Sequence, residues 1–362
     1  MSQLQRKSSA GSRLTFVWIP AVACLALLGL TEQVFTQANQ NRANRMWAPP
    51  LTGPVAGEIQ VLPVQGNVHV LIGAGGNITV QAGNDGVLMV DTGTAAMSAK
   101  VIAAMRSISN RPLRYIVNTT DRADHTGGNS AIADIGETIP FREPNYTAGP
   151  QGALDVGRAS IIAYYTVMHR MSAPTGKAAP IPESGWPDNT YSIAQKRLYF
   201  NDEPVVIMHQ TANSDGNSIV LFRKSDVVSA GDLLATDTFP IFDAQSDGAL
   251  QGGLNGLNRV LAMAVPRFNQ MDGTEVIPGH GRVCDEADVA EFRDMGTIVR
   301  DRIQHMIDKK MTLAQVKAAR PLLASRANSR SASTASALVE LASAVRPRAR
   351  QTPRNRLRRA AG

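Results

Sequence analysis

Four short polar segments, each directly after an apolar run, constrain the fold of this chain more than any other feature. They are Asp91-Thr92-Gly93, the stretch TDRADHTGGN from Thr120 to Asn129, Ser229-Ala230-Gly231-Asp232 and Pro278-Gly279-His280-Gly281. Loops at strand ends are where a rigid scaffold usually places its reactive groups. The pattern therefore predicts a functional site assembled from the ends of several strands.

The sequence between these segments indicates strands in runs, with helices inserted between them. Valine- and isoleucine-rich runs bounded by glycine are typical of strands, and apolar positions three or four apart are typical of helices. This order favours two sheets covered by helices on both outer faces. We expect strands at Glu58–Val64, Asn67–Gly73, Asn77–Gln81, Val87–Val90, Leu113–Val117, Pro204–Met208, Ser218–Phe222, Asp226–Ser229 and Glu275–Ile277, helices at Ala95–Ser109, Ala153–Met171, Leu254–Val265 and Glu286–Lys310, and a proline-rich connector around Ala173–Pro187.

Taken together, the four polar segments resemble the metallo-β-lactamase superfamily, which includes zinc β-lactamases and glyoxalase II. The motif DTG or PGHG alone would be weak evidence, but four segments in the family's order, each after an apolar strand, form a specific signature. The resemblance covers residues 58 to 320. It implies an α/β fold, the αβ/βα four-layer sandwich, with the active groove along one edge of the two sheets.

The family's first metal motif, H-x-H-x-D-H, is only partly present. Thr120 and Arg122 stand at the positions of its first two histidines, and Asn213 stands where the family has its next histidine ligand. None of these three is a good zinc ligand, so the first metal site is degenerate. The positions that match the second site are all retained, and the resemblance makes them metal ligands: Asp124, His125, Asp232 and His280.

One metal ion at the second site is the expected cofactor. Zinc is favoured, iron or manganese would suit the same two carboxylates and two imidazoles, and an inactive protein could hold none. In the hydrolytic interpretation, Arg122 steadies the developing oxyanion, and Asp124 or Asp232 handles the proton. The alternative for Arg122 is a salt bridge to Asp121, Asp124 or Asp232. The resemblance makes Asp91 structural, with the role of orienting the histidine loop.

The other histidines are weaker candidates. His209 is a candidate substitute ligand because it lies four residues before Asn213. It would need a register change to reach the groove from the end of its strand, and the alternative is a packed histidine or one that supports a ligand. His69, His169 and His305 lie in strand or helix patterns, where structural or surface roles are expected.

The two ends of the chain differ from the rest. Arg6, Lys7 and Arg13 precede the apolar run Leu14–Leu30, which is typical of a secretory signal, and an uncleaved membrane anchor is the alternative. We therefore expect residues 1–38 to be a signal peptide or anchor, residues 39–57 a linker, and the body to be periplasmic or secreted. Residues 321–362 contain nine arginines and one acid, with few large apolar residues, and are expected to be a disordered tail.

Composition narrows the function classes. The two cysteines, Cys24 and Cys284, exclude a disulfide scaffold and a cysteine-rich zinc module. The net charge of +7 comes from the tail, because residues 1–320 carry 28 basic and 29 acidic side chains. No nucleic-acid partner is therefore expected, and binding of an anionic polymer or a membrane surface by the tail ranks last among the hypotheses.

The leading hypothesis is an exported metal-dependent hydrolase that cleaves an ester, lactone or amide bond in a small molecule. The alternative is a catalytically inactive protein of the same fold with a binding or structural role. β-Lactam cleavage is not favoured, because Thr120, Arg122 and Asn213 remove the site on which most zinc β-lactamases rely. Neither the substrate nor the oligomeric state follows from the sequence.

Overall fold

The computed structural model of the chain describes residues 57–138, 157–173, 179–238, 242–243, 248–264, 273–319 and 321. The expected signal or anchor segment, all but the last residue of the linker and all but the first residue of the basic tail lie outside these residues. Among the helices that are described, none is long and apolar enough to cross a membrane.

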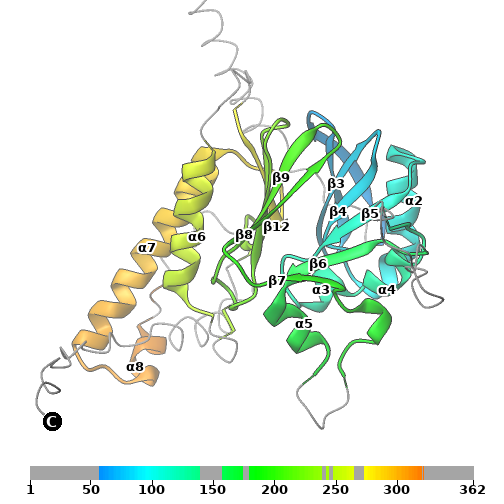
Figure 1. Ribbon diagram of the computed structural model, residues 1–362. Coiled ribbons are helices and arrows are strands. Elements are labelled where there is room, and N and C mark those ends of the chain that lie inside the picture. Colours follow the sequence, from blue (N-terminus) through cyan, green and yellow to red (C-terminus); the bar gives the residue numbers. More distant parts are fainter. Residues whose placement is uncertain are drawn as a thin grey trace, which may run out of the picture. The chain divides into compact units, whose positions relative to one another are not determined.

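The first sheet, within the described residues, has seven strands that follow chain order from β1 to β7 (Figure 1). Strands β1 to β4 pair antiparallel, and β4 to β7 pair parallel, so the connections after β4 carry helices. The strands are β1 Gln60–Gln65, β2 Val68–Ala74, β3 Gly76–Gly83, β4 Gly86–Val90, β5 Leu113–Val117, β6 Ser160–Tyr164 and β7 Asn189–Tyr191, and the helical segments are η1 Ala95–Met97, α2 Ser98–Ile108, α3 Ala123–Thr126, α4 Asn129–Ala133, α5 Tyr165–Met171 and η2 Glu183–Gly185.

The second sheet has the strand order β12-β11-β10-β9-β8 in the described part of the chain. Its strands pair antiparallel except for β11 and β12, which are parallel and are connected through α6. The elements are β8 Gln195–Phe200, β9 Glu203–His209, β10 Ser218–Phe222, β11 Val227–Ala235, α6 Leu250–Met263 and β12 Glu275–His280, followed by α7 Glu286–Asp308 and α8 Leu313–Ala318.

Separate parts of the hydrophobic core lie between the layers of the fold, as the two faces of β4 show. Val87 and Met89 pack in the cluster that contains residues of α2 and α4, while Leu88 and Val90 pack in the cluster shared with the second sheet. A strand buried on both faces reads as a continuous apolar run. Helices α6 and α7 cover the outer face of the second sheet (Figure 1). The expected αβ/βα four-layer sandwich is confirmed.

One expected element is wrong in part. The helix expected over Ala153–Met171 is helical only in α5, because Ser160–Tyr164 form β6, and residues 153–156 lie outside the described residues. The run Ser-Ile-Ile-Ala-Tyr is almost entirely buried between parallel neighbours, and periodicity alone cannot distinguish such a run from a helix.

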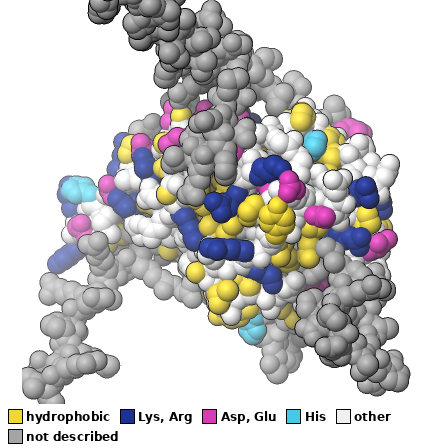
Figure 2. Space-filling model, turned by 45° about the horizontal axis from the view of Figure 1, so that its top comes forward, with side chains coloured by type: hydrophobic (Ala, Val, Ile, Leu, Met, Phe, Trp, Pro, Cys, Tyr) yellow, Lys and Arg dark blue, Asp and Glu magenta, His cyan; other side chains and the backbone are white. Residues whose placement is uncertain are grey.

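Other boundaries moved, and some elements were missed. The strand expected at Asp226–Ser229 continues to Ala235, and the helix expected from Leu254 begins at Leu250. The sequence analysis missed β7, β8, α3, α4 and α8. Strand β8 begins with three polar residues and lies at a sheet edge, where charged side chains such as Arg197 protect against pairing with other chains. Figure 2 shows one face on which Lys and Arg side chains are interspersed with hydrophobic and acidic ones.

Candidate metal centre

The candidate site lies where strands of both sheets end. Asp91 follows β4 directly, and the segment after β5 leads into α3, which carries Asp124 and His125. The parallel pair of the second sheet supplies Asp232 within β11 and His280 at the end of β12. In open α/β sheets, ligands bind at the carboxyl ends of the strands, and the site occupies this position in both sheets.

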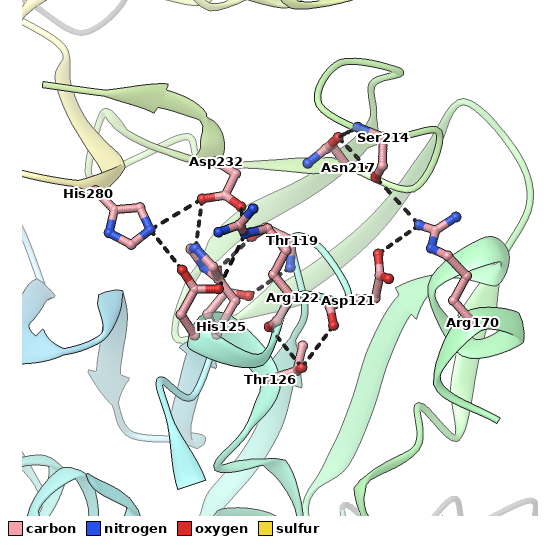
Figure 3. A network of polar contacts seen from close by, with 12 residues as sticks. Thr119, Asp121, Arg122, His125, Thr126, Arg170, Ser214, Asn217, Asp232 and His280 are labelled. Carbon is pink, nitrogen blue, oxygen red and sulfur yellow. Dashed lines mark hydrogen bonds and ion pairs between the residues drawn. The ribbon is translucent and has the colours of Figure 1, made fainter. Parts of the chain in front are cut away.

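Three of the four expected metal ligands form one candidate metal group, and the fourth, Asp232, contacts both of its histidines. One donor atom each from Asp124, His125 and His280 lie within 4.8 Å of one another. His280 Nε2 is 3.1 Å from Asp124 Oδ2 and 3.5 Å from Asp232 Oδ1, and His125 Nε2 is 2.8 Å from the same Asp232 oxygen (Figure 3). Imidazole nitrogens and carboxylate oxygens suit zinc, iron or manganese. This donor set therefore fits one divalent ion.

Asp91 fixes the orientation of His125. The Asp91 Oδ2 atom accepts a hydrogen bond from His125 Nδ1 at 2.7 Å, and the same carboxylate accepts hydrogen bonds from the Thr119 backbone N–H at 2.8 Å and the Thr119 hydroxyl at 2.7 Å. Thr92 holds the backbone of the histidine, since its N–H donates to the His125 carbonyl at 2.7 Å. A carboxylate behind Nδ1 leaves Nε2 to face the ion.

A bulge in β11 directs Asp232 toward the centre. The pairing of β11 with β12 shifts register between Ser229 and Gly231, and a bulge of this kind re-aims the side chains that follow it. Gly231 has a φ of 53°, and a Cβ there would lie 2.6 Å from Thr119 Oγ1. Glycine is therefore required beside Asp232 for both conformation and space.

Arg122 lies between two of the carboxylates. Its Nε is 3.0 Å from Asp232 Oδ2 and 3.3 Å from Asp124 Oδ1, with the side chain 40% exposed. The salt-bridge alternative from the sequence is thus formed with Asp124 and Asp232. Asp121 instead pairs with Arg170, at 2.8 Å (Figure 3). The centre therefore contains a fixed positive charge as well as its four candidate ligands.

Close contact between carboxylates and imidazoles shifts their protonation. Burial opposes a charged imidazole, but the carboxylates of Asp232 and Asp91 raise the pKa of His125 well above its usual range. Hydrogen bonds to Asp124 and then Asp232 raise the pKa of His280 to about 9. Burial raises the pKa of Asp124 and Asp232, but the imidazoles and Arg122 outweigh it and hold both below the usual range. Both imidazoles therefore favour the charged form, with a proton on each ring nitrogen, near neutral pH while no ion is bound.

A sequence model of the metallo-beta-lactamase superfamily matches residues 71–280. The chain belongs to this superfamily. The match confirms the resemblance inferred from the four polar segments. No curated protein sequence matches the chain.

Two solved sulfatase structures show the same fold at low sequence identity. The sec-alkylsulfatase Pisa1 from Pseudomonas sp., described as stereoselective and inverting, is 12% identical, with a TM-score of 0.56 over 79% of this chain and 50% of the sulfatase. A double mutant of the sec-alkyl sulfatase PisA1 is 13% identical, with a TM-score of 0.50 over 72% of this chain and 45% of that one. DIM-1 metallo-beta-lactamase is 15% identical, with a TM-score of 0.47 over 66% of this chain and 97% of that one. The chain spans about half the length of the sulfatases.

In this superfamily member, the degenerate first-site positions are held by protein contacts. Thr120 and Asn213 are buried, at 1% and 7% exposure. Next to each lies an aspartate or serine that contacts Arg170. The Arg170 guanidinium pairs with Asp121 in one loop and with Asp215 in the other. A protein cation therefore joins the two loops in which the superfamily's first-site histidines would stand.

His209 is not a substitute ligand. It ends β9, and its ring stacks on Tyr164 with ring centroids 3.6 Å apart and an interplanar angle of 10°. Its Nε2 lies 2.6 Å from the carbonyl oxygen of Asp215. The ring is thus used in packing and in holding the loop after β9.

The sequence analysis missed Thr119, Arg170 and Asn77. Thr119 is adjacent to the recognised motif, so its position after β5 was the available signal. Arg170 was assigned to a helix, and nothing in its neighbourhood marks the two aspartates that it contacts. Asn77 was assigned to a strand, and its partners lie about two hundred residues away in the chain, at separations of 201 and 204.

Proposed function

We propose that this superfamily member is a metal-dependent hydrolase that cleaves an ester, lactone or amide bond of a small molecule. A single metal ion, with zinc favoured, would be held by Asp124, His125, Asp232 and His280. The observation that carries the proposal is the convergence of these donors, with Asp91 fixing the first imidazole. A bound divalent ion supplies Lewis-acid activation of water and of the scissile carbonyl.

The chain's own residues supply the remaining chemistry. Arg122 presents a cation beside the ligands, where it can stabilise negative charge that develops on the carbonyl oxygen. Asp124 is the residue that we assign to the proton, because its side chain is 25% exposed whereas that of Asp232 is 6% exposed. A carboxylate reached by solvent can pass a proton on, while the buried one holds its place.

A cavity beside the centre supports a small-molecule substrate. Arg122 and Asp124 line one part of this cavity, whose volume is about 1030 Å³. Its other walls include small and apolar residues: Ala95, Ala123, Gly127, Ala131, Ile181 and Pro182. Cavities of this size and character suit small organic ligands. We therefore propose a substrate with an apolar group attached to the carbonyl that is cleaved.

Elemental analysis of the purified full chain, combined with a panel of esters, lactones and amides, tests this function. We expect close to one zinc, iron or manganese per chain and hydrolysis of at least one substrate, both lost in Asp232→Ala. Asp301→Ala is the matched control, because this aspartate is exposed on α7 and its described partner is the neighbouring Arg300. Absence of stoichiometric metal would overturn the proposal. Bound metal without hydrolysis would favour the catalytically inactive alternative.

We also propose that the chain is exported, on the basis of the basic residues and the apolar run Leu14–Leu30. Fractionation of expressing cells, with sequencing of the mature N-terminus, tests this. A protein beginning near Asn39 outside the cytoplasm, or a full-length protein in the membrane, is expected. Full-length protein in the cytosolic fraction would contradict it.

A further inference from the structure

The turn between β2 and β3 touches the candidate ligands although it supplies none of them. Asn77, the second residue of β3, is 7% exposed. Its Nδ2 donates to the carbonyl oxygens of Pro278 and Gly281, both at 2.9 Å. These two carbonyls lie on either side of His280 in the chain. Both amide hydrogens of one side chain therefore hold the backbone that carries a candidate ligand.

The same turn also packs against His125. A Cβ on Gly76 would lie 2.7 Å from Cε1 and 3.0 Å from Nε2 of that ring, and 3.1 Å from the carbonyl oxygen of Asp124. The conformation of the turn comes from Gly75, whose φ is 109°, whereas Gly76 is required for space. Backbone of the first sheet thus lies directly against the Nε2 edge of His125.

His280 needs this support because of where its strand lies. Within the described residues, β12 is the edge strand of the second sheet: β11 is the strand that pairs with it, and an isolated bridge joins its Val276 to Cys284. On the β11 side, the Thr236 N–H donates to the His280 carbonyl at 3.0 Å. On the other side no strand is paired with it, and Asn77 reaches across from the first sheet to the two neighbouring carbonyls.

We propose that Asn77 is a positioning residue for His280, and that the Gly75-Gly76-Asn77 turn sets the distance between the His280 and His125 imidazoles. The ring centroids of these two histidines are 5.4 Å apart. The inference rests on the proposed metal centre. In this arrangement the first sheet acts as the template on which ligands from both sheets are brought to one point.

The test compares Asn77→Ala with Asn201→Ala. Asn201 is a stringent control: it is also buried, at 8% exposure, its Nδ2 also donates to a backbone carbonyl of the other sheet, that of Gly86, at 3.1 Å, and alanine at its φ of 52° adds backbone strain. Both variants should lose stability, since each leaves a buried carbonyl without its donor. Only Asn77→Ala should weaken zinc binding, by about 10–100-fold, which is the usual loss when a residue supporting a metal ligand is removed.

Asn77→Asp separates donation from size. It keeps the shape of the side chain but places a carboxylate against the Pro278 and Gly281 carbonyls, where two hydrogen-bond donors are needed. We therefore expect zinc affinity to fall in the order wild type, Asn77→Ala, Asn77→Asp. Equal affinities for the wild type and both Asn77 variants would overturn the proposal.

A second measurement gives an answer that does not depend on the proposed function. In the metal-free protein, the NMR signal of the His280 Cε1–H group should move in Asn77→Ala and remain in place in Asn201→Ala. If the wild type takes up no zinc, the proposed function fails, and the His280 signal still decides the positioning role. If Asn77→Ala leaves both the zinc affinity and the His280 signal as Asn201→Ala does, Asn77 only ties the sheets together and the inference is wrong.

Discussion

Replacing Arg122 by methionine should tighten metal binding and slow hydrolysis at the same time. The guanidinium Nε is 3.0 Å from Asp232 and 3.3 Å from Asp124, so it already occupies part of both carboxylates that the ion would use. Methionine keeps a long apolar stem but removes the charge and the donors. The effect on the ion and the effect on the reaction therefore have opposite signs.

The magnitude follows from the geometry and exposure of the two contacts. Two unit charges 4 Å apart attract by about 1 kcal/mol in water and about 4 kcal/mol at an effective dielectric constant of 20. Because the Arg122 side chain is 40% exposed, the lower value applies, and exposed ion pairs contribute about 0.2–1 kcal/mol each. Together the two contacts account for about 0.4–2 kcal/mol, so their loss should tighten metal binding about 2–30-fold.

The assay is competition for zinc against a chelating indicator at pH 7, combined with the turnover of a substrate identified in the hydrolase panel. Loss of one donor to a developing oxyanion lowers kcat by about 100–1,000-fold, and a fall of that order is expected for Arg122→Met. Arg122→Lys keeps the charge and should bind zinc as the wild type does. Weaker zinc binding by Arg122→Met would refute the competition, and an unchanged kcat would refute the role in the transition state.

Four further predictions concern the centre and the sheets around it. Metal affinity should rise between pH 6 and pH 9, with up to two protons released near pH 7. The reason is that a hydrogen bond to Asp124 raises the pKa of His280 to about 9, and the pKa of His125 is raised well above its usual range. Calorimetry in buffers of different ionisation enthalpy counts the protons, and an affinity independent of pH would contradict the prediction. The same raised pKa of His280 stabilises the metal-free protein below pH 6.5, and this contribution should disappear as the pH rises through about 9, which urea unfolding at several pH values measures. Asp91→Asn should weaken zinc binding about 10–100-fold. The carboxylate accepts hydrogen bonds from Thr119 and His125 on its two oxygens, whereas an amide would turn a donor toward one of these groups. Wild-type affinity would show that the orientation of His125 does not depend on Asp91. Glu203→Gln should lower the free energy of unfolding by about 1–3 kcal/mol and leave zinc affinity unchanged. This buried carboxylate accepts hydrogen bonds from Gln81 and Ser225 at the end of β3 away from the centre. An accompanying loss of zinc affinity would show that the two ends of the sheet are coupled.

The candidate ligands could be predicted from the sequence because four polar segments, each after an apolar strand, resemble the motifs of the superfamily. Such a strand is buried on both faces, as β4 is, so the first polar residue after it must lie at an edge of the sheet. His125 and His280 were singled out by this position, whereas the structural role of Asp91 came from the resemblance. The fold followed from the same pattern, since runs of strands interrupted by helices favour layered sheets.

What could not be predicted depends on contacts between distant parts of the chain. The partners of Asn77 are 201 and 204 residues away, and no local pattern records such a hydrogen bond. Which of three nearby aspartates pairs with Arg122 depends on the backbone at the start of α3, a helix of only four residues. Strand β6 was predicted as a helix for a local reason, because an apolar run of five residues fits a helix and a strand equally well.

The charges of the candidate centre are consistent with one bound metal ion beside a degenerate first site. Asp91, Asp124 and Asp232 bring three negative charges, Arg122 brings one positive charge, and both imidazoles add a proton each while no ion is bound, so the total is zero. A divalent ion that displaces those two protons leaves the total unchanged. With a neutral histidine in place of Arg122 and no second ion, the total would be −1 in both states, inside a largely buried site where uncompensated charge is costly. Under the proposed one-metal function, Arg122 would thus supply the positive charge that a first-site metal would otherwise supply. On this argument, Arg122→Met should destabilise the folded protein in both the metal-free and the metal-bound state, even though it binds the ion more tightly.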